Sequence, residues 1–251
     1  MPTDGLRVLV AIATYKERAN LEALVRGIHE AVPGAHVLIT DDNSPDGTGK
    51  LADQLAQADP RIAVHHRPGK LGLGTAILSG LRIAIDRGYD VAVTMDADFS
   101  HHPRYLPALL AGMKTHEVMI GSRYVPGAAT VNWPWSRLLM SRGVNFLVRF
   151  LMRLPARDCS GGFRGYAAPL LRRAAIDRLV SHGYSFQEEM LLRCFQAGAK
   201  IGETPIVFEN RTEGASKVNL GEMVRSLAVL LRLGLRVMFG WEKGRGTGIS
   251  S

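Results

Sequence analysis

Cysteine is scarce in this sequence: the 251 residues include two, Cys159 and Cys194. Two cysteines supply neither a disulfide framework nor a structural zinc cluster, so reduced, cytoplasmic chemistry is expected. The N-terminal residues also lack the apolar core of a signal peptide, and residues 8–13 have the length of a strand. We find no internal repeat, which excludes a solenoid or a propeller.

Acidic and aromatic residues are few. Asp and Glu total 23 against 31 Lys and Arg, which gives a net charge of +8 and a pI near 9.8. This excess favours an anionic partner: nucleic acid, a phosphorylated ligand or acidic lipid. Aromatic residues make up 7% and do not alternate with the arginines as base-stacking platforms would. The composition therefore argues against nucleic acid.

Long uncharged apolar runs are absent as well. Residues 220–239 have the length of about 20 residues that a membrane-spanning helix needs, but they include Glu222, Arg225, Arg232 and Arg236. Each arginine near the middle of a span costs about 2.5–3.5 kcal/mol on insertion scales. We expect this amphipathic helix to lie in the membrane surface; its apolar face also suits packing on the domain or on a small membrane-anchored protein partner.

Strand-like and helix-like segments alternate through the first 120 residues. Apolar runs at residues 8–13, 36–40, 62–66, 91–95 and 117–121 are separated by segments of helical period. This alternation predicts an α/β fold with a mostly parallel central sheet flanked by helices. Ligands of such sheets bind beyond the carboxyl ends of the strands, which is where the polar loops of this sequence fall.

The pattern changes after residue 120. We predict helices at residues 136–152, 168–181, 186–197 and 220–239, a strand at 200–208, and polar loops at 158–166 and 209–217. Pro205 indicates that the last strand lies at a sheet edge. The resulting organisation is a main domain over residues 1–217, followed by an amphipathic interfacial helix and flexible tail over residues 218–251.

The chain is organised around residues 91–103, where an apolar strand ends on Asp96-Ala-Asp98. Strand side chains alternate, so the two carboxylates share a face if the extended conformation continues past the sheet. Two hard oxygen donors at an open edge suit Mg²⁺ or Mn²⁺, and such an ion stabilises a diphosphate leaving group. The carboxylates also suit capping of a helix that begins at Pro103. A zinc site with the two adjacent histidines is less favoured.

Two further loops follow strands. In residues 41–48 the Asp42 carboxylate is suited to accept hydrogen bonds from the N–H groups of a nucleobase, while Asp46 or Thr48 caps the next helix. Residues 69–74 are rich in glycine, but they lack the lysine of a phosphate-binding loop and do not follow the first strand. We therefore interpret residues 69–74 as a helix entry.

Charged residues gather on the later loops predicted to reach the same edge. The cations there are Arg123, Arg164, Arg211 and Lys217. Each is suited to clamp an anion or to lie on the surface as a solvated charge, and their number favours an anion site. Gln187, Glu188 and Glu189 open a helix, where acids also complement the helix dipole. That structural explanation applies most strongly to Glu188.

Nine of these motifs occur in one order, at residues 14–17, 41–48, 72–76, 95–103, 121–127, 141–146, 158–164, 184–189 and 211–217. Together they resemble the inverting family 2 glycosyltransferases, in particular the polyprenol-phosphate (dolichol-phosphate) mannose synthases. The resemblance implies the GT-A nucleotide-diphospho-sugar transferase fold. It also implies transfer of mannose from GDP-mannose to a polyprenyl or dolichyl phosphate, with inversion to a β-linked product.

The resemblance assigns candidate catalytic and binding residues. The nucleotide sugar would contact Thr14, Tyr15, Glu17, Asp42, Asp96, Arg211 and Lys217. Asp98, Asp96 and Gln187 would hold Mg²⁺ or Mn²⁺, with Glu189 near the sugar and metal. Arg123, Arg137 and Ser141 would bind the acceptor phosphate, while Arg211 and Lys217 would close on the diphosphate from a mobile loop.

The residues alone do not distinguish guanine from uracil. A UDP-glucose-dependent polyprenyl-phosphate glucosyltransferase is therefore an alternative within the same fold. A non-enzymatic module that binds anionic membrane or nucleic acid is an alternative of another class, and a requirement for Mg²⁺ or Mn²⁺ separates it from an enzyme. A lipid acceptor would place the protein peripherally on the cytoplasmic face of a membrane.

Overall fold

A computed structural model describes residues 5–181, 183, 185–209 and 220–239, with the backbone alone for residues 220–225. Its central sheet has seven strands in the order β3-β2-β1-β4-β7-β5-β8. They are β1 Val8–Thr14, β2 His36–Asp41, β3 Ile62–His66, β4 Val91–Asp96, β5 Val118–Ser122, β7 Arg164–Ala167 and β8 Ile201–Pro205. β7 runs antiparallel to both neighbours and the other pairings are parallel. The predicted mostly parallel sheet is confirmed.

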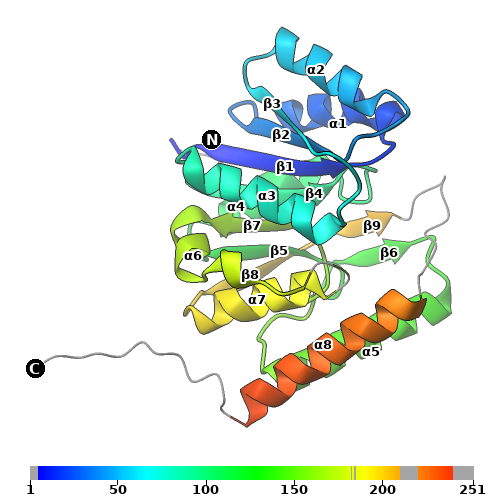
Figure 1. Cartoon of the computed structure of the whole chain (residues 1–251). Coiled ribbons are helices and arrows are strands. Elements are labelled where there is room, and N and C mark those ends of the chain that lie inside the picture. The colour runs from blue at the N-terminus through cyan, green and yellow to red at the C-terminus, as the bar shows by residue number, and fades with distance from the viewer. Residues whose placement is uncertain (1–4, 182, 184, 210–219, 240–251) are drawn as a thin grey trace, which may run out of the picture.

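Helices cover both faces of the sheet (Figure 1). The helices on one face are α1 Arg18–Ala31, α2 Thr48–Ala58 and α4 Leu106–Gly112; α4 follows the 3-10 turn η1 Pro103–Tyr105. The helices on the other face are α3 Leu73–Asp86, α6 Ala168–Arg173 and α7 Phe186–Gln196; the 3-10 turn η2 Ile176–Arg178 lies between α6 and α7. Strand β1 shows why its sequence is continuously apolar. Val8, Val10 and Ile12 enter one hydrophobic cluster, and Leu9 enters the other.

Three segments differ from the sequence expectation. The predicted loop 158–166 contains β7, whose glycine and arginine gave no strand signal. The strand predicted at 200–208 is divided into β8 and β9 Val207–Glu209, and β9 pairs with β6 Ala129–Val131. The helix expected at 168–181 ends at Arg173. Pro205 has no N–H for a ladder, and β8 ends there as the edge strand of the sheet, as predicted.

The helices α5 Trp135–Met152 and α8 Leu220–Met238 run side by side below the sheet in Figure 1. They approach closely, since a Cβ added at Gly234 would lie 2.6 Å from Leu151 Cβ. Leu230 and Leu233 of α8 are buried in the core, whereas Leu227 and neighbouring apolar residues are exposed. The predicted single apolar face of this helix is therefore divided in two. None of the helices in the described ranges combines the length and the low charge needed to cross a bilayer.

Candidate active site

The carboxyl ends of β1, β2 and β4 meet at one edge of the sheet. Parallel pairing places Thr14 of β1 beside Asp41 of β2, and Ala13 of β1 beside Asp96 of β4. These strands are buried on both faces, so polar side chains become tolerable where the strands leave the sheet. The motifs that follow the three strands are thereby brought to one edge.

Asp96 ends β4, and the chain bends directly after it. Phe99 has a positive φ of 61°, and the Asp98 carboxylate accepts a hydrogen bond from the Ser100 N–H at 3.0 Å. The expected extended continuation past the sheet is therefore wrong. A tight turn, and not strand alternation, sets the directions of the two carboxylates.

The two histidines of this turn hold it in place. His101 Nδ1 accepts a hydrogen bond from the Asp96 N–H at 3.1 Å, and its ring stacks on Phe163. Burial lowers the pKa of His101, although nearby carboxylates oppose the shift, so the ring is neutral. His102 Nδ1 accepts from the Arg104 N–H and caps the 3-10 turn. The residue that caps the 3-10 turn is thus a histidine and not an aspartate. The Nδ1 atoms of both histidines accept backbone hydrogen bonds within this segment.

Gln187, in the first turn of α7, faces the Asp96 turn. Its Oε1 atom is buried without a hydrogen-bond partner. A Cβ added at Gly162 would lie 3.4 Å from Gln187 Nε2 and 3.8 Å from Asp96 Oδ1, so Gly162 keeps this space open. No group of three or more His, Cys, Asp or Glu side chains within the described residues is placed to hold a metal. Asp96, Asp98 and the Gln187 amide are nevertheless hard oxygen donors of the kind that Mg²⁺ and Mn²⁺ prefer, and they fit such an ion with substrate oxygens and water completing its shell.

Asp42 follows β2 and is buried beside Arg67, which follows β3. Asp42 Oδ1 lies 3.1 Å from Arg67 Nη1, but the two atoms are not aligned for a hydrogen bond and neither makes another. Burial raises the pKa of Asp42, and Arg67 opposes that rise. Arg67 is anchored by Nη2, which donates to Thr75 Oγ1 at 2.7 Å. A buried carboxylate and guanidinium with unmet hydrogen-bonding capacity suit the polar edge of a base.

The predicted nucleotide-binding residues after β1 are next to this loop. The Thr14 hydroxyl donates to the Thr40 carbonyl oxygen at 3.3 Å, so it ties β1 to β2. The Tyr15 ring lies under Lys70 Nζ, 4.5 Å from the centroid, and Glu17 accepts a hydrogen bond from Asn20 Nδ2. Arg211 and Lys217 lie outside the described residues.

Arg123 follows β5 and is fixed by a buried carboxylate. Its Nε and Nη2 atoms each donate to one oxygen of Asp158 at 2.7 Å, and Nη2 also donates to Ser160 Oγ at 2.8 Å. The Asp158 side chain is fully buried and that of Arg123 is 9% exposed. Burial alone would raise the pKa of Asp158, but Arg123 outweighs it and lowers that pKa. Arg123 is thus a cation that the buried Asp158 carboxylate holds in a fixed position.

Arg137 and Ser141 of α5 reach the same place. The Arg137 guanidinium lies 4.2 Å from the centroid of the Trp133 ring, and Ser141 Oγ lies 2.7 Å from the Tyr124 hydroxyl. Burial and the nearby charge of Arg123 lower the pKa of Arg137. A phosphate dianion between the two cations would relieve their repulsion. The structure therefore brings together the three residues expected at the acceptor phosphate.

Asn145 and Asp158 were not assigned from the sequence. Asn145 Oδ1 accepts the Cys159 N–H at 2.7 Å, and its Nδ2 donates to Ser160 Oγ at 3.1 Å. Asn145 thereby ties α5 to the loop that carries Asp158. The signal for Asp158 was its place in the glycine-rich motif at 158–164, but a lone aspartate in a loop does not reveal which cation it meets.

Arg164 was expected among the ligand-facing cations and is instead fully buried. It donates to the backbone oxygens of Gln187 and Cys159 and so supports the start of α7 from beneath. The expectation of an exposed anion clamp at this position was wrong, because the residue belongs to strand β7 and points into the core.

Glu188 and Glu189, both in the first turn of α7, have different surroundings. The Glu189 carboxylate accepts backbone N–H groups of Val180 and Ser181 and pairs with Arg193, so it anchors the segment before α7. Burial raises the pKa of Glu188 to about 7, and its Oε2 atom has no hydrogen-bond partner. Glu188, and not Glu189, is thus the acid of α7 whose carboxyl group lacks full compensation.

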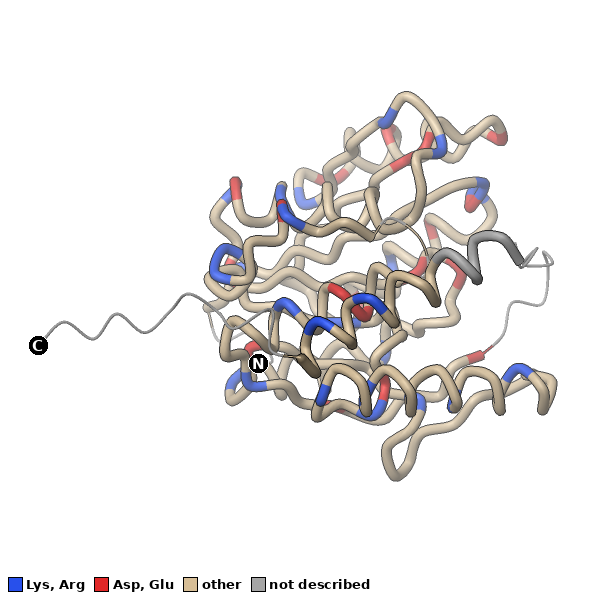
Figure 2. Tube along the Cα trace, turned by 60° about the horizontal axis from the view of Figure 1, so that its bottom comes forward, with Lys and Arg blue, Asp and Glu red and all other residues tan. Residues whose placement is uncertain are grey.

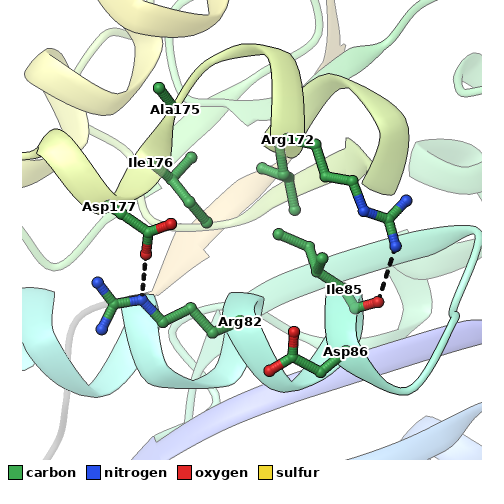
Figure 3. A pocket seen from close by; sticks show the side chains of 8 residues that line it. Arg82, Ile85, Asp86, Arg172, Ala175, Ile176 and Asp177 are labelled. Atoms are coloured by element: carbon green, nitrogen blue, oxygen red, sulfur yellow. Dashed lines mark hydrogen bonds and ion pairs between the residues drawn. The ribbon is translucent and has the colours of Figure 1, made fainter.

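Two surface hollows are also present. One, of about 510 Å³, is lined by residues of the loop after β2 and by His66; Asp42 does not line it. The other, of about 310 Å³, lies between α3 on one side and α6 with the residues that follow it on the other (Figure 3). There Arg82 pairs with Asp177 at 2.6 Å, and Arg172 donates to the Ile85 carbonyl oxygen. Both arginines are thus engaged within the protein, and we assign no ligand to this hollow.

Curated proteins similar in sequence cover nearly the whole chain. A polyprenol monophosphomannose synthase of Mycolicibacterium smegmatis is 43% identical over 92% of this chain and 88% of that protein. An undecaprenyl-phosphate mannosyltransferase of Micrococcus luteus is 43% identical over 94% of this chain and 97% of that protein.

Solved structures resemble the fold at low identity. Glucosyl-3-phosphoglycerate synthase from Mycobacterium tuberculosis, in complex with Mn²⁺, UDP and phosphoglyceric acid, superimposes with a TM-score of 0.63 at 17% identity, covering 100% of this chain and 83% of that one. A mannosyltransferase from Pyrobaculum calidifontis in complex with GDP-Man and Mn²⁺ gives 0.58 at 17% identity, covering 98% and 67%. These likenesses confirm the expected fold. Residues 9–174 match Glycosyl transferase family 2, and with relatives at 43% identity over almost its full length the chain belongs to this family.

Proposed function

We propose that this glycosyltransferase moves mannose from GDP-mannose to a polyprenyl phosphate and releases polyprenyl β-mannosyl phosphate. The two mannosyltransferases at 43% identity, which act on polyprenyl phosphates by name, support both the sugar and the acceptor. The structural observation that carries the proposal is that Arg123, Arg137 and Ser141 share two aromatic neighbours. Arg123 contacts both Trp133 and Tyr124, Arg137 contacts Trp133, and Ser141 contacts Tyr124. Asp96 lies close enough to Arg123 to act on its charge, so donor and acceptor groups share one site.

The acceptor needs positioning more than deprotonation. The second pKa of a phosphomonoester is about 6, so its oxygen is already anionic at neutral pH. Arg123, held by Asp158, would bind this phosphate together with Arg137 and the Ser141 hydroxyl through charge-assisted hydrogen bonds. A single displacement at the anomeric carbon inverts it, and an α-linked donor then gives a β-linked product.

The donor lies at the ends of β1, β2 and β4. Asp42 with Arg67 would bind the base, and Thr14, Tyr15 and Glu17 would border the nucleotide. Asp96, Asp98 and Gln187 would hold Mg²⁺ or Mn²⁺, which when bound stabilises charge on the leaving diphosphate; the Mn²⁺ in the solved mannosyltransferase supports a divalent ion. Arg211 and Lys217, in the segment that the structure does not describe, are proposed to add positive charge there.

Because the proposed acceptor is a lipid, the reaction would take place at a membrane surface. We propose a peripheral position on the cytoplasmic face, with residues 1–217 as the catalytic domain and residues 218–251 as the membrane-directed part. A small membrane-anchored protein is the other candidate partner for α8.

Labelled lipid measures the proposed reaction. The chain is incubated with labelled GDP-mannose, polyprenyl phosphate and either Mg²⁺ or Mn²⁺, and the lipid is extracted; a parallel reaction contains UDP-glucose. We expect labelled lipid from GDP-mannose and not from UDP-glucose, and no labelled lipid after chelation of the ion. Labelled lipid from UDP-glucose alone would contradict GDP-mannose as the donor. No labelled lipid from either donor would contradict polyprenyl phosphate as the acceptor.

A further inference from the structure

Trp133 lies in the connection between β6 and α5. The strand ends at Val131 and the helix begins at Trp135, and the chain turns between them at Asn132, which has a positive φ of 60°. The Trp133 side chain is partly buried, whereas Trp135, two residues later, is 78% exposed. The two tryptophans therefore have different surroundings, and Trp133 is the one that contacts the acceptor residues.

Both acceptor cations lie over the Trp133 ring. The guanidinium carbon of Arg137 is 4.2 Å from the ring centroid, and that of Arg123 is 5.5 Å away. Both distances are within the range of about 6 Å at which an aromatic face attracts a cation, and indole is the strongest of the aromatic faces. Trp133 Nε1 is buried and makes no hydrogen bond within the described part of the chain. The contacts that the structure shows for this indole are thus made by its ring.

The two arginines are held in different ways. Arg123 is paired with the buried carboxylate of Asp158, which offsets its charge. An aromatic face attracts a cation through its quadrupole and brings no opposite charge. The Trp133 ring can therefore fix the position of Arg137 without neutralising it. A cation that is held in place and keeps its charge is suited to a phosphate.

The surroundings of Arg137 oppose its charge. It lies in the first turn of α5, where the positive end of the helix dipole disfavours a cation. The sequence of α5 contains no Asp or Glu, and Figure 2 shows blue positions along this helix at the front of the molecule. Burial and the charge of Arg123 lower the pKa of Arg137. Repulsion would separate the two guanidinium groups before a phosphate binds, and attraction to the shared Trp133 ring opposes this separation.

Trp133 is itself fixed from the donor side of the site. The Phe208 ring of β9 meets it edge-on, with 5.5 Å between the centroids, and also meets the His101 ring edge-on at 5.3 Å. His101 Nδ1 in turn accepts a hydrogen bond from the Asp96 N–H. Since β9 pairs with β6, Phe208 is joined by backbone to the strand that leads to Trp133. A column of three rings thus connects the turn after β4 with Arg137.

We propose that Trp133 is a positioning residue that holds Arg137 beside Arg123 for the acceptor phosphate. The ring column through Phe208 keeps this arrangement at a fixed distance from the turn that carries Asp96. The inference rests on the proposed function, since it takes Arg137 to bind the acceptor phosphate. Trp133 acts in this role through Arg137 and does not need to touch the substrate.

Steady-state kinetics of the full chain test this role with GDP-mannose and geranyl phosphate, a short, water-soluble isoprenyl phosphate. W133L should lower kcat/KM for geranyl phosphate about tenfold and leave the KM for GDP-mannose unchanged. W133F keeps an aromatic face and loses an N–H that has no partner, so it should stay within about threefold of the parent. The matched control is W135L, which removes the exposed tryptophan and should behave like the parent.

A double-mutant cycle separates positioning from a merely structural role. In the R137A background, W133L should change kcat/KM for geranyl phosphate by less than about twofold, because the group on which Trp133 acts is gone. A structural role would lower kcat/KM equally in both backgrounds. If circular dichroism shows that W133L is unfolded, W133M takes its place in every measurement, since the flexible methionine side chain fills irregular space and has no aromatic face.

Calorimetric titration with geranyl phosphate, in the presence of GDP and Mg²⁺, measures binding without transfer. A parent chain that binds geranyl phosphate more tightly than W133L but transfers no mannose would refute the proposed function and support the role of Trp133. A parent chain that does not bind it would overturn both. Three kinetic results would overturn the positioning role alone: parental kcat/KM in W133L, a W133F variant as impaired as W133L, or an effect of W133L that persists without Arg137.

Discussion

The donor half and the acceptor half of this site are built differently. The donor half consists of short loops that directly follow parallel strands β1, β2 and β4, so the sheet brings Asp42, Asp96 and Asp98 to one edge. The acceptor half joins α5, the end of β5 and an irregular loop, and it is held by the buried pair of Arg123 and Asp158. Substitution of the partly buried Asp98 in the donor half should therefore cost mainly activity, whereas substitution of the buried Asp158 beneath the acceptor half should also cost stability.

The largest effect is expected in the donor half, from Asp98→Ala. Loss of one preorganised group that stabilises charge in the transition state lowers kcat by about 10²–10³. Because Asp98→Ala would also weaken binding of the divalent ion, we expect a fall near ~10³. Asp98 is only partly buried and lies in a turn beyond the end of β4, so the melting temperature should stay close to that of the parent. Labelled lipid formation and thermal unfolding measure the two quantities, with Asp86→Ala on the exposed end of α3 as control. Turnover near that of Asp86→Ala would show that Asp98 does not act on the donor.

Beneath the acceptor half, Asp158→Asn should unfold more easily. Removing one partner of a buried ion pair costs about 3–5 kcal/mol, because Arg123 is left uncompensated. The matched control is Asp177→Asn, whose partner Arg82 is exposed (Figure 3); an exposed pair contributes at most about 1 kcal/mol. Urea unfolding measures both. Equal losses for the two variants would mean that the acceptor half does not depend on this pair.

The same contrast explains how much the sequence could predict. Strands β1 to β4, their helices and the polar loops at their ends follow from apolar runs and helical periodicity, which are local properties. The positions of Asp42, Asp96 and Asp98 at one edge then follow from parallel topology. The extended backbone expected after Asp96 was wrong, because the chain bends there and Phe99 adopts a positive φ.

The acceptor half could not be predicted to the same depth. β7 is a short strand with glycine and a buried arginine, so it resembled a loop, and its antiparallel place between β4 and β5 is a long-range property. The pairing of Arg123 with Asp158 joins residues 35 apart in sequence. Resemblance placed Arg137 and Ser141 at the acceptor, but the roles of Asn145 and Glu189 depend on contacts that no periodicity reveals.

A pH-dependent effect is expected for Glu188→Gln. Burial raises the pKa of Glu188 from 4.5 to about 7, so between these values the unfolded chain releases a proton that the folded chain keeps. Stability therefore falls as pH rises through this window, and the loss of about 3 kcal/mol is complete above it. Glutamine has no proton to release, so the variant should gain stability over the parent between about pH 5 and pH 8. Urea unfolding at several pH values measures the difference, and a flat difference would contradict the raised pKa.

The smallest effect, and the one that sharpens the contrast most, is expected from Arg137→Ala. Loss of one charge-assisted hydrogen bond costs about 1.5–3 kcal/mol, which corresponds to about 10- to 100-fold in kcat/KM for the acceptor. The KM for GDP-mannose should not change, because Arg137 lies with Arg123 and Trp133 on the acceptor side.

Arg142→Ala is the control for this prediction, since Arg142 is exposed on the same helix but on the opposite face. With a short, water-soluble acceptor, Arg142→Ala should retain the parental kcat/KM, whereas Arg137→Ala should not. With acceptor in anionic vesicles both should lose activity, Arg142→Ala through weaker vesicle binding, worth about 1 kcal/mol per basic residue. A defect of Arg137→Ala that appears in the KM for GDP-mannose instead would place this residue in the donor half, and the division of the site would have to be drawn elsewhere.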